Sequence, residues 1–299
     1  MGDGTGGGAV AGPVPAVGFG ARLAEAVRRT GPLCAGIDPS ASLLARWGLS
    51  DDAKGLGEFG YRCVDAFADV VPVVKPQVAF FERHGSAGMA ALESLVIAAR
   101  AAGLLVITDA KRGDIGSTME AYASAWVDDA SPFAGDACTA VAYLGLGALE
   151  PMVTLAGSTG RGVIVVVRSS NPEGRALQQA RTGNGDGDGD GPTVEDLLLG
   201  QIAALNAGGT VPPGTVGAVV GATLEPSGFD LASLGGPILA PGLGAQGATA
   251  EDVAALFGGC PPGSVVASSS RSLLVAGPDV ESLRRAAVAA RDEVGAALA

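Results

Sequence analysis

Short apolar runs alternate with longer amphipathic segments along most of this 299-residue chain, and this alternation constrains the fold more than any other feature. Most of the runs are continuously apolar, as is typical of parallel strands that are buried on both faces. The eight strands that we expect are Leu33–Asp38, Val71–Lys75, Leu104–Asp109, Ala137–Ala142, Gly162–Arg168, Val216–Ala222, Pro237–Ala240 and Ser264–Ser268.

Helix-like segments separate the expected strands. They are Ala21–Arg29, Gly57–Ala68, Ser86–Ala102, Ser117–Asp129, Val194–Ala207, Ala250–Phe257 and Val280–Leu298. Strands that alternate with helices in this number predict a fold of the α/β class, a (β/α)8 TIM barrel. A doubly wound open sheet is the alternative, because it uses the same alternation.

Length and composition fit a single domain. Hydrophobic residues make up 47% of the chain, so we expect residues 19–299 to form one barrel around a large core. Residues 1–18 are rich in Gly, Ala and Pro and predict a disordered tail. The Gly/Asp repeat at 182–191 lacks the hydrophobic position of a calcium-binding β-roll and the closing Glu of an EF-hand. We therefore expect a flexible insertion there.

Charge and cysteine content limit the class of partner and the compartment. The formal net charge of −12 argues against general affinity for nucleic acid or an anionic membrane, although a few clustered cations can still bind a small anion. The sequence contains no signal-peptide pattern and no apolar span long enough to cross a bilayer, so we expect a cytoplasmic location. The four cysteines are far apart, and we expect Cys34 and Cys138 to be buried free thiols.

Polar side chains recur at the carboxyl ends of the expected strands. They are Asp38, Lys75, Asp109 with Lys111, Arg168 with Ser169 and Ser170, and Arg271. In an α/β barrel these ends meet on one face, and that face carries the active site. We assign no catalytic role to Arg168 and expect it only to orient loops.

The most informative of these positions form a charged array. Asp109 and Lys111 are two residues apart at a strand end, so their side chains point to the same side. Lys75 ends the neighbouring strand, and Asp114 follows in the next loop. The sequence predicts an alternating Lys-Asp-Lys-Asp cluster in which each charge stabilises the opposite charge beside it. Such a cluster is costly to desolvate, which favours a catalytic site over a purely structural network.

The segment Thr108–Thr118, with its Asp-x-Lys-x-x-Asp pattern, resembles the signature of the orotidine 5′-monophosphate decarboxylase suprafamily in its long bacterial form. The resemblance covers roughly residues 20–295 and includes further matches in the same order. They are Gly36-Ile37-Asp38-Pro39, Val74-Lys75-Pro76-Gln77, Ser169-Ser170-Asn171-Pro172, Pro241-Gly242-Leu243-Gly244-Ala245-Gln246-Gly247 and Ser270-Arg271. Each match is weak alone, but together and in order they are specific.

The resemblance implies a carboxy-lyase that converts orotidine 5′-monophosphate to uridine 5′-monophosphate and carbon dioxide, in the last step of de novo pyrimidine synthesis. It implies that Asp38 and Lys75 contact the ribose hydroxyls and that Asp109 lies against the substrate carboxylate. Lys111 would stabilise the carbanion that forms at C6 and donate the proton that replaces carbon dioxide. These roles agree with the need for fixed positive charge where negative charge develops.

The same resemblance extends to the rest of the substrate and to a second subunit. Ser170 would bind the pyrimidine, and Gln246 and Arg271 would bind the phosphate. Asp114 and Thr118 resemble the residues that the family contributes to the active site of a partner subunit, which implies a homodimer with composite sites.

Two alternatives remain from other functional classes. Magnesium-dependent sugar-phosphate decarboxylases or aldolases of the suprafamily share Asp-x-Lys-x-x-Asp, but they carry a metal-binding Glu where this chain has Lys75. A lysine repels a divalent cation, so we expect no metal and no cofactor. A catalytically silent phosphate-binding barrel is the second alternative, and it would not require the costly set Lys75, Asp109, Lys111 and Asp114.

Overall fold

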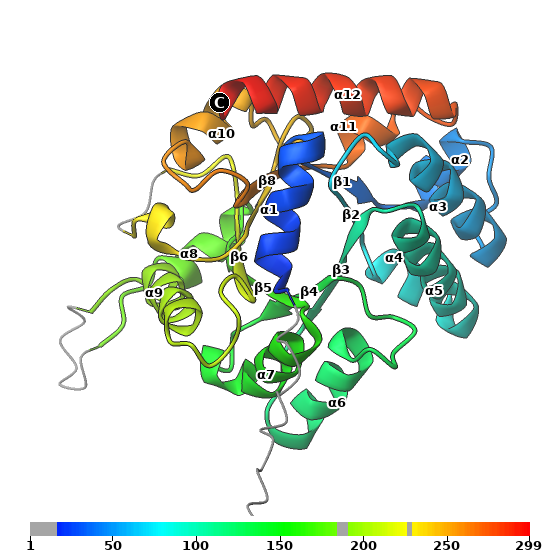
Figure 1. Ribbon diagram of the computed structural model, residues 1–299. Coiled ribbons are helices and arrows are strands. Elements are labelled where there is room, and N and C mark those ends of the chain that lie inside the picture. The colour runs from blue at the N-terminus through cyan, green and yellow to red at the C-terminus, as the bar shows by residue number, and fades with distance from the viewer. Residues whose placement is uncertain (1–16, 184–190, 226–228) are drawn as a thin grey trace, which may run out of the picture.

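The computed structural model describes residues 17–183, 191–225 and 229–299, and these form a closed barrel of eight parallel strands in the order β1 to β8 (Figure 1). The expected (β/α)8 barrel is confirmed, and the doubly wound open sheet is wrong. The strands are β1 (Leu33–Ile37), β2 (Val73–Pro76), β3 (Leu105–Arg112), β4 (Ala137–Val141), β5 (Gly162–Arg168), β6 (Val216–Val220), β7 (Ile238–Pro241) and β8 (Val265–Ser269).

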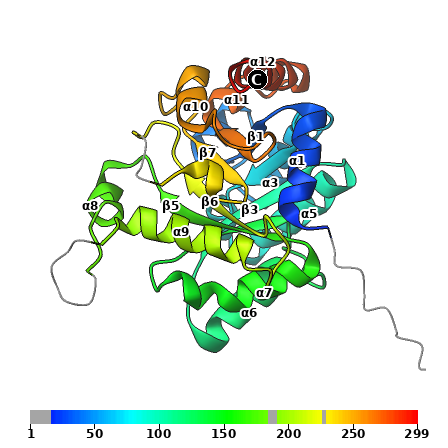
Figure 2. The same cartoon turned by 60° about the vertical axis from the view of Figure 1, so that its left-hand side comes forward.

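Helices lie outside the ring of strands in both views (Figures 1 and 2). They are α1 (Phe19–Thr30), α2 (Ala41–Arg46), α3 (Ala53–Phe67), α4 (Ala79–Glu82), α5 (Gly85–Ala101), α6 (Gly116–Val127), α7 (Glu150–Thr159), α8 (Arg175–Gln178), α9 (Val194–Ala207), α10 (Ala250–Phe257), α11 (Arg271–Leu274) and α12 (Val280–Ala297). The exception is α1, which crosses over the middle of the barrel in Figure 1. Among the described residues, no helix is both long and apolar enough to cross a membrane.

All eight expected strands are present, and their boundaries shift by a few residues. Five helices were not expected from the sequence: α2, α4, α7, α8 and α11. Four of these are short helices within loops, where no apolar stripe has room to repeat. The fifth, α7, contains Val, Thr and Gly, which have low helix propensity, and it begins with a proline in its first turn.

The interior of the barrel is filled by side chains that point inward from every strand, together with one face of α1. The strands contribute Cys34, Val73, Ile107, Ala137, Ile164, Val219, Leu239 and Val266, and the helix contributes Phe19, Leu23 and Val27. Arg22 of α1 holds the helix in place, because its guanidinium lies 2.5 Å from Asp136 Oδ1 and donates to the carbonyl of Gly160 at 2.9 Å. These partners immediately precede β4 and β5, so α1 closes the amino-terminal end of the barrel.

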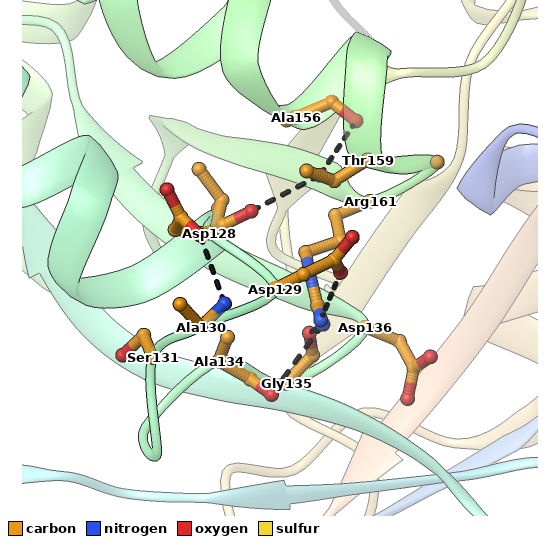
Figure 3. A network of polar contacts seen from close by, with 12 residues as sticks. Asp128, Asp129, Ala130, Ser131, Ala134, Gly135, Asp136, Ala156, Thr159 and Arg161 are labelled. Atoms are coloured by element: carbon orange, nitrogen blue, oxygen red, sulfur yellow. Dashed lines mark hydrogen bonds and ion pairs between the residues drawn. The ribbon is translucent and has the colours of Figure 1, made fainter. Parts of the chain in front are cut away.

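A second polar network ties two connections together at that same end (Figure 3). Arg161 is 4% exposed, pairs with Asp129 at 2.8 Å and donates to the carbonyl of Gly135. The hydroxyl of Thr159 donates to the carbonyls of Val127 and Ala156 at 3.0 and 3.3 Å. These contacts join the end of α7 to the segment between α6 and β4, which leaves the carboxyl ends of the strands as the open face.

Several expectations fall partly on residues that the structure does not describe. Residues 1–16 of the expected tail and 184–190 of the expected insertion lie outside the described residues. The segments flanking the insertion pair with one another, since Thr182 N donates to Pro192 O and Gly191 N donates to Thr182 O, both at 2.9 Å. Cys34, Cys63 and Cys138 are buried free thiols, as expected for the first and third, and Cys260 is half-buried.

Truncation of Phe19 tests the closure of the barrel by α1. Phe19 is 0% exposed inside the barrel, so Phe19→Ala leaves a cavity and should lower the free energy of unfolding by about 3–5 kcal/mol. Val17, two residues earlier and 64% exposed, provides the control, and Val17→Ala should change stability by less than about 0.5 kcal/mol. Urea unfolding measures both variants. Equal effects of the two substitutions would mean that α1 does not pack in the barrel as described.

Candidate active site

A cavity of about 420 Å³ opens at the carboxyl ends of the strands. Its lining includes residues that follow or end β1, β2, β3, β5, β7 and β8. The predicted site residues that line it are Asp38, Lys75, Asp109, Lys111, Ser170, Gln246 and Arg271. The fold therefore brings together side chains that are spread over more than two hundred positions of the sequence, as the strand-end pattern predicts.

The carboxylate of Asp109 is the centre of the site and accepts hydrogen bonds at both oxygens. Lys75 Nζ and Gln77 Nε2 donate to Oδ2 at 2.8 and 2.9 Å. Lys111 Nζ and the Thr139 hydroxyl donate to Oδ1 at 2.6 and 2.9 Å. Asp109 is only 7% exposed, so these donors replace the water that a carboxylate would otherwise bind.

The charges of this cluster stabilise one another. Burial alone would raise the pKa of Asp109, but the ammonium groups of Lys75 and Lys111 outweigh that effect and hold the pKa well below its usual value. Burial alone would lower the pKa of Lys75, but the carboxylates of Asp109 and Asp38 outweigh it and raise the pKa instead. Both groups are therefore charged throughout the range around neutral pH.

An irregular end of β3 directs Lys111 toward Asp109. Thr108 pairs with Cys138 and Arg112 pairs with Ala140, so four steps along β3 correspond to two along β4. The extra residues bulge, and Lys111 has a φ of 50°, a left-handed conformation that is uncommon for residues other than glycine. Gly113 allows the close approach that follows, because a Cβ atom there would lie 2.2 Å from the carbonyl oxygen of Val141. The side chains of Asp109 and Lys111 do point to the same side, as predicted. The cause is this bulge and not the regular alternation of side chains along a strand.

Asp38 follows β1, the strand next to β2, and has an oxygen free for a ligand. Ser270 donates its hydroxyl to Asp38 Oδ2 at 2.6 Å. The second oxygen, Oδ1, is buried and has no hydrogen-bond partner among the described residues. A buried carboxylate oxygen without a donor is costly, so this atom is suited to accept a hydroxyl from a bound ligand.

The loop after β7 and the start of α11 form the remaining wall. Gln246 in this loop accepts a hydrogen bond from the Ser170 hydroxyl at 3.0 Å, which links the end of β5 to the loop. Gly242 and Gly244 have φ angles of 121° and 76°, which only glycine adopts readily, so the loop depends on them. No carboxylate among the residues placed by the structure pairs with Arg271, which leaves its guanidinium available to an anion.

Three residues that contact the predicted set were not predicted. Gln77 is two residues after Lys75, and in an extended chain side chains two residues apart point to the same side. This spacing could have identified Gln77. Thr139 is a single polar residue within the apolar strand β4 and is 1% exposed, which is a weaker signal. Ser270 stands next to Arg271, but nothing in the sequence pairs it with Asp38.

Arg168 has the structural role that the sequence analysis expected. Its Nε lies 2.8 Å from Glu195 Oε2 of α9, and its NH2 group donates to the carbonyl of Glu225 at 2.8 Å. Arg168 is 1% exposed and does not line the cavity. It joins the end of β5 to α9 and to the loop after β6, so it orients loops.

The remaining predicted residues, Asp114 and Thr118, do not line the cavity of their own chain. Asp114 Oδ1 accepts from the backbone N–H of Ile115 at 2.8 Å, and Thr118 is exposed on α6. Within one chain the charged cluster consequently contains Lys75, Asp109 and Lys111 without Asp114. Asp114 is not bonded to this cluster in the single chain, and its predicted place in the site of a partner subunit stays a prediction.

The chain is similar to proteins of one family along most of its length. The model of the "Orotidine 5'-phosphate decarboxylase / HUMPS family" matches residues 31–286. The orotidine 5′-phosphate decarboxylase of Salinispora arenicola is 54% identical over 269 residues, which are 90% of this chain and 94% of that protein. The corresponding protein of Streptomyces coelicolor is 52% identical over 270 residues, with the same two coverages.

A solved structure supports the same relationship. The crystal structure of a putative orotidine 5′-phosphate decarboxylase from Streptomyces avermitilis has a TM-score of 0.88 to this chain and is 51% identical. The similarity covers 95% of this chain and 97% of that one. The two proteins thus share the barrel fold over most of their length.

Removal of the Lys75 charge tests whether Asp109 depends on it. Lys75→Met leaves a buried carboxylate with one ammonium partner and should lower the free energy of unfolding by about 3–5 kcal/mol. Lys54→Met, an exposed lysine on α3, is the matched control and should change it by less than about 0.5 kcal/mol.

The loss of unfolding free energy in Lys75→Met should depend on pH. In the wild type the folded pKa of Asp109 lies below its unfolded value, so its contribution to stability is present above about pH 4 and is lost as the pH falls further. Lys75→Met removes the ammonium that depresses this pKa. The difference in stability between wild type and variant should therefore shrink as the pH falls below about 4. A difference that stays constant with pH would contradict the charge pairing.

Proposed function

The chain belongs to the orotidine 5′-phosphate decarboxylase / HUMPS family, and on this premise we propose that it is an orotidine 5′-phosphate decarboxylase. It converts orotidine 5′-monophosphate to uridine 5′-monophosphate and carbon dioxide, the last step of pyrimidine synthesis. The observation that carries this proposal is the Lys75–Asp109–Lys111 cluster in the cavity, with both lysines bonded to one buried carboxylate. We also propose the cytoplasm as the location.

The cavity has a group for each part of this substrate. Arg271 offers a planar guanidinium to the phosphate, and Gln246 lies beside it in the loop after β7. Asp38 Oδ1 accepts a ribose hydroxyl, which satisfies the oxygen that is otherwise without a donor. Ser170, already bonded to Gln246, donates to or accepts from the pyrimidine. These contacts fix the substrate at both ends and so orient its carboxylate toward Asp109.

The reaction itself needs positive charge and a proton at one carbon atom. Loss of carbon dioxide leaves an electron pair at C6, and the Lys111 ammonium stabilises the negative charge that develops there. Lys111 then donates its proton to C6, which completes the product. Asp109 holds Lys111 in place at 2.6 Å and keeps a fixed negative charge where the carboxylate leaves. Lys75 holds Asp109 ionised from the opposite side.

The metal-dependent alternative fits this arrangement less well. Lys75 Nζ lies 2.8 Å from Asp109 Oδ2, where its charge repels a divalent cation. Among residues 17–183, 191–225 and 229–299, no three His, Cys, Asp or Glu side chains group in a way that could hold a metal ion. We therefore propose that the site works without a metal ion.

We also propose that the active unit is a homodimer with composite sites. Asp114 and Thr118 stand outside their own cavity, next to large apolar side chains that are exposed to solvent in one chain. Ile115 is 62% exposed, Tyr143 77% and Leu144 55%. We propose that these side chains form one apolar surface, because Gly113 after β3 lies against Val141 at the end of β4, where the two loops that carry them begin. A second copy that covers this surface brings its own Asp114 toward the Lys75–Asp109–Lys111 cluster.

The decarboxylation assay tests the proposed function. Purified protein should release carbon dioxide from orotidine 5′-monophosphate in the presence of EDTA. Lys111→Ala should lower kcat by about 10³-fold or more, because it removes both the charge and the proton donor. Lys54→Met, with the same charge change on the surface, should keep wild-type activity. A requirement for added magnesium would shift the assignment to the metal-dependent relatives.

Mixing two inactive variants tests the composite site. Lys111→Ala and Asp114→Asn should each be nearly inactive as homodimers. After subunit exchange, a heterodimer contains one site with both residues intact, so the mixture should recover about a quarter of wild-type activity. Lys111→Ala mixed with the double variant Lys111→Ala/Asp114→Asn contains no intact site and should stay inactive. If Asp114 served its own chain's site, neither mixture would recover activity.

A further inference from the structure

We propose that Thr139 is a positioning residue for the reaction, and that its hydroxyl sets the direction of the Lys111 side chain. This inference rests on the proposed decarboxylase function, in which Lys111 stabilises and protonates the reacting carbon. Thr139 lies on β4, beside the bulged end of β3 that carries Asp109 and Lys111. It does not line the cavity, so it acts through these two residues rather than on the substrate.

The Thr139 hydroxyl bridges the two functional residues. It donates to Asp109 Oδ1 at 2.9 Å and accepts from the backbone N–H of Lys111 at 2.9 Å. A hydroxyl has one proton, and an ionised carboxylate can only accept, so the direction of both hydrogen bonds is determined. Since Thr139 is 1% exposed, water does not readily replace either contact. One buried hydroxyl thus connects the backbone of Lys111 to the carboxylate that holds its ammonium group.

The backbone contact matters because Lys111 is in an unfavourable conformation. A φ of 50° costs a residue other than glycine about 1–2 kcal/mol, and the bulge interrupts the regular strand pairing that would otherwise hold the segment. The hydrogen bond from Lys111 N–H to Thr139 offsets part of that cost. Without it, the segment is free to relax toward an ordinary conformation, and the ammonium group moves from its place at the cavity.

Loss of the hydroxyl should impair chemistry more than binding. The groups assigned to the phosphate, ribose and pyrimidine do not contact Thr139, so their ground-state interactions remain. Asp109 also keeps its pairs with Lys75 and Gln77. Displacement of a catalytic group by about 1 Å can lower the rate by about 100-fold. A purely structural role would instead lower stability without a selective effect on kcat.

A series of substitutions at one position separates these roles. Thr139→Val preserves the shape of the side chain and removes the hydroxyl, whereas Thr139→Ser keeps the hydroxyl and removes the methyl group. Thr108→Val is the matched control, because Thr108 is also buried on β3 beside β4. Its hydroxyl donates to the carbonyl of Ala137 at 3.2 Å and also contacts the Cys138 thiol, not Asp109 or Lys111.

Steady-state decarboxylation of orotidine 5′-monophosphate is measured for all variants, together with their melting temperatures. Thr139→Val should lower kcat by about 10- to 100-fold, with KM within about twofold of the wild type. Thr139→Ser should restore kcat to within about threefold, and Thr108→Val should keep wild-type kcat even if it melts earlier. A crystal structure of Thr139→Val should show Lys111 Nζ displaced from Asp109 Oδ1.

The outcomes distinguish this inference from the function on which it rests. Wild-type kcat in Thr139→Val, or equal losses in the Val and Ser variants, would overturn the positioning role while the decarboxylase function stands. A loss that appears only in KM would overturn it as well. Absence of turnover in the wild-type protein itself would overturn both proposals.

Discussion

The site depends on one buried carboxylate and the donors that surround it. Removal of Asp109 from water is costly, and two ammonium groups and two neutral donors from β2, β3, β4 and the residue after β2 compensate for that cost. The same contacts fix the position of both lysines. The contacts that hold the pKa of Asp109 low are the same contacts that fix its position at the strand ends. A change in either lysine therefore alters the pKa of Asp109 as well as the geometry of the site.

The opposite, amino-terminal end of the barrel is closed by packing. There, α1 fills the interior with apolar side chains, and Arg22 and Arg161 tie the strand starts and the α6–β4 segment to their neighbours. This closed end provides packing. The open end holds a carboxylate oxygen on Asp38 and a guanidinium on Arg271 that have no partner within the described part of the chain. The end closed by α1 and the end proposed for chemistry thus lie at opposite ends of the barrel axis.

Much of this arrangement could be predicted from the sequence because it follows from periodicity. Apolar runs located the strands, and the meeting of parallel strand ends placed Asp38, Lys75, Asp109, Ser170 and Arg271 in one cavity. The bulge at Lys111 could not be predicted, since it is a property of the pairing between β3 and β4. Thr139 was missed for the same reason. Strand periodicity could not place Asp114 either, because it lies in the loop after β3 and no longer follows the alternation of the strand.

The measurement that tests this account most directly is a crystal structure of the protein with uridine 5′-monophosphate. The account predicts the phosphate on Arg271 and Gln246, a ribose hydroxyl on Asp38 Oδ1, and the pyrimidine between Ser170 and Lys111, with Lys111 Nζ facing C6. It also predicts Asp114 of a partner subunit beside this cluster. A nucleotide bound elsewhere, or a metal ion coordinated by Asp109 with Lys75 displaced, would contradict it.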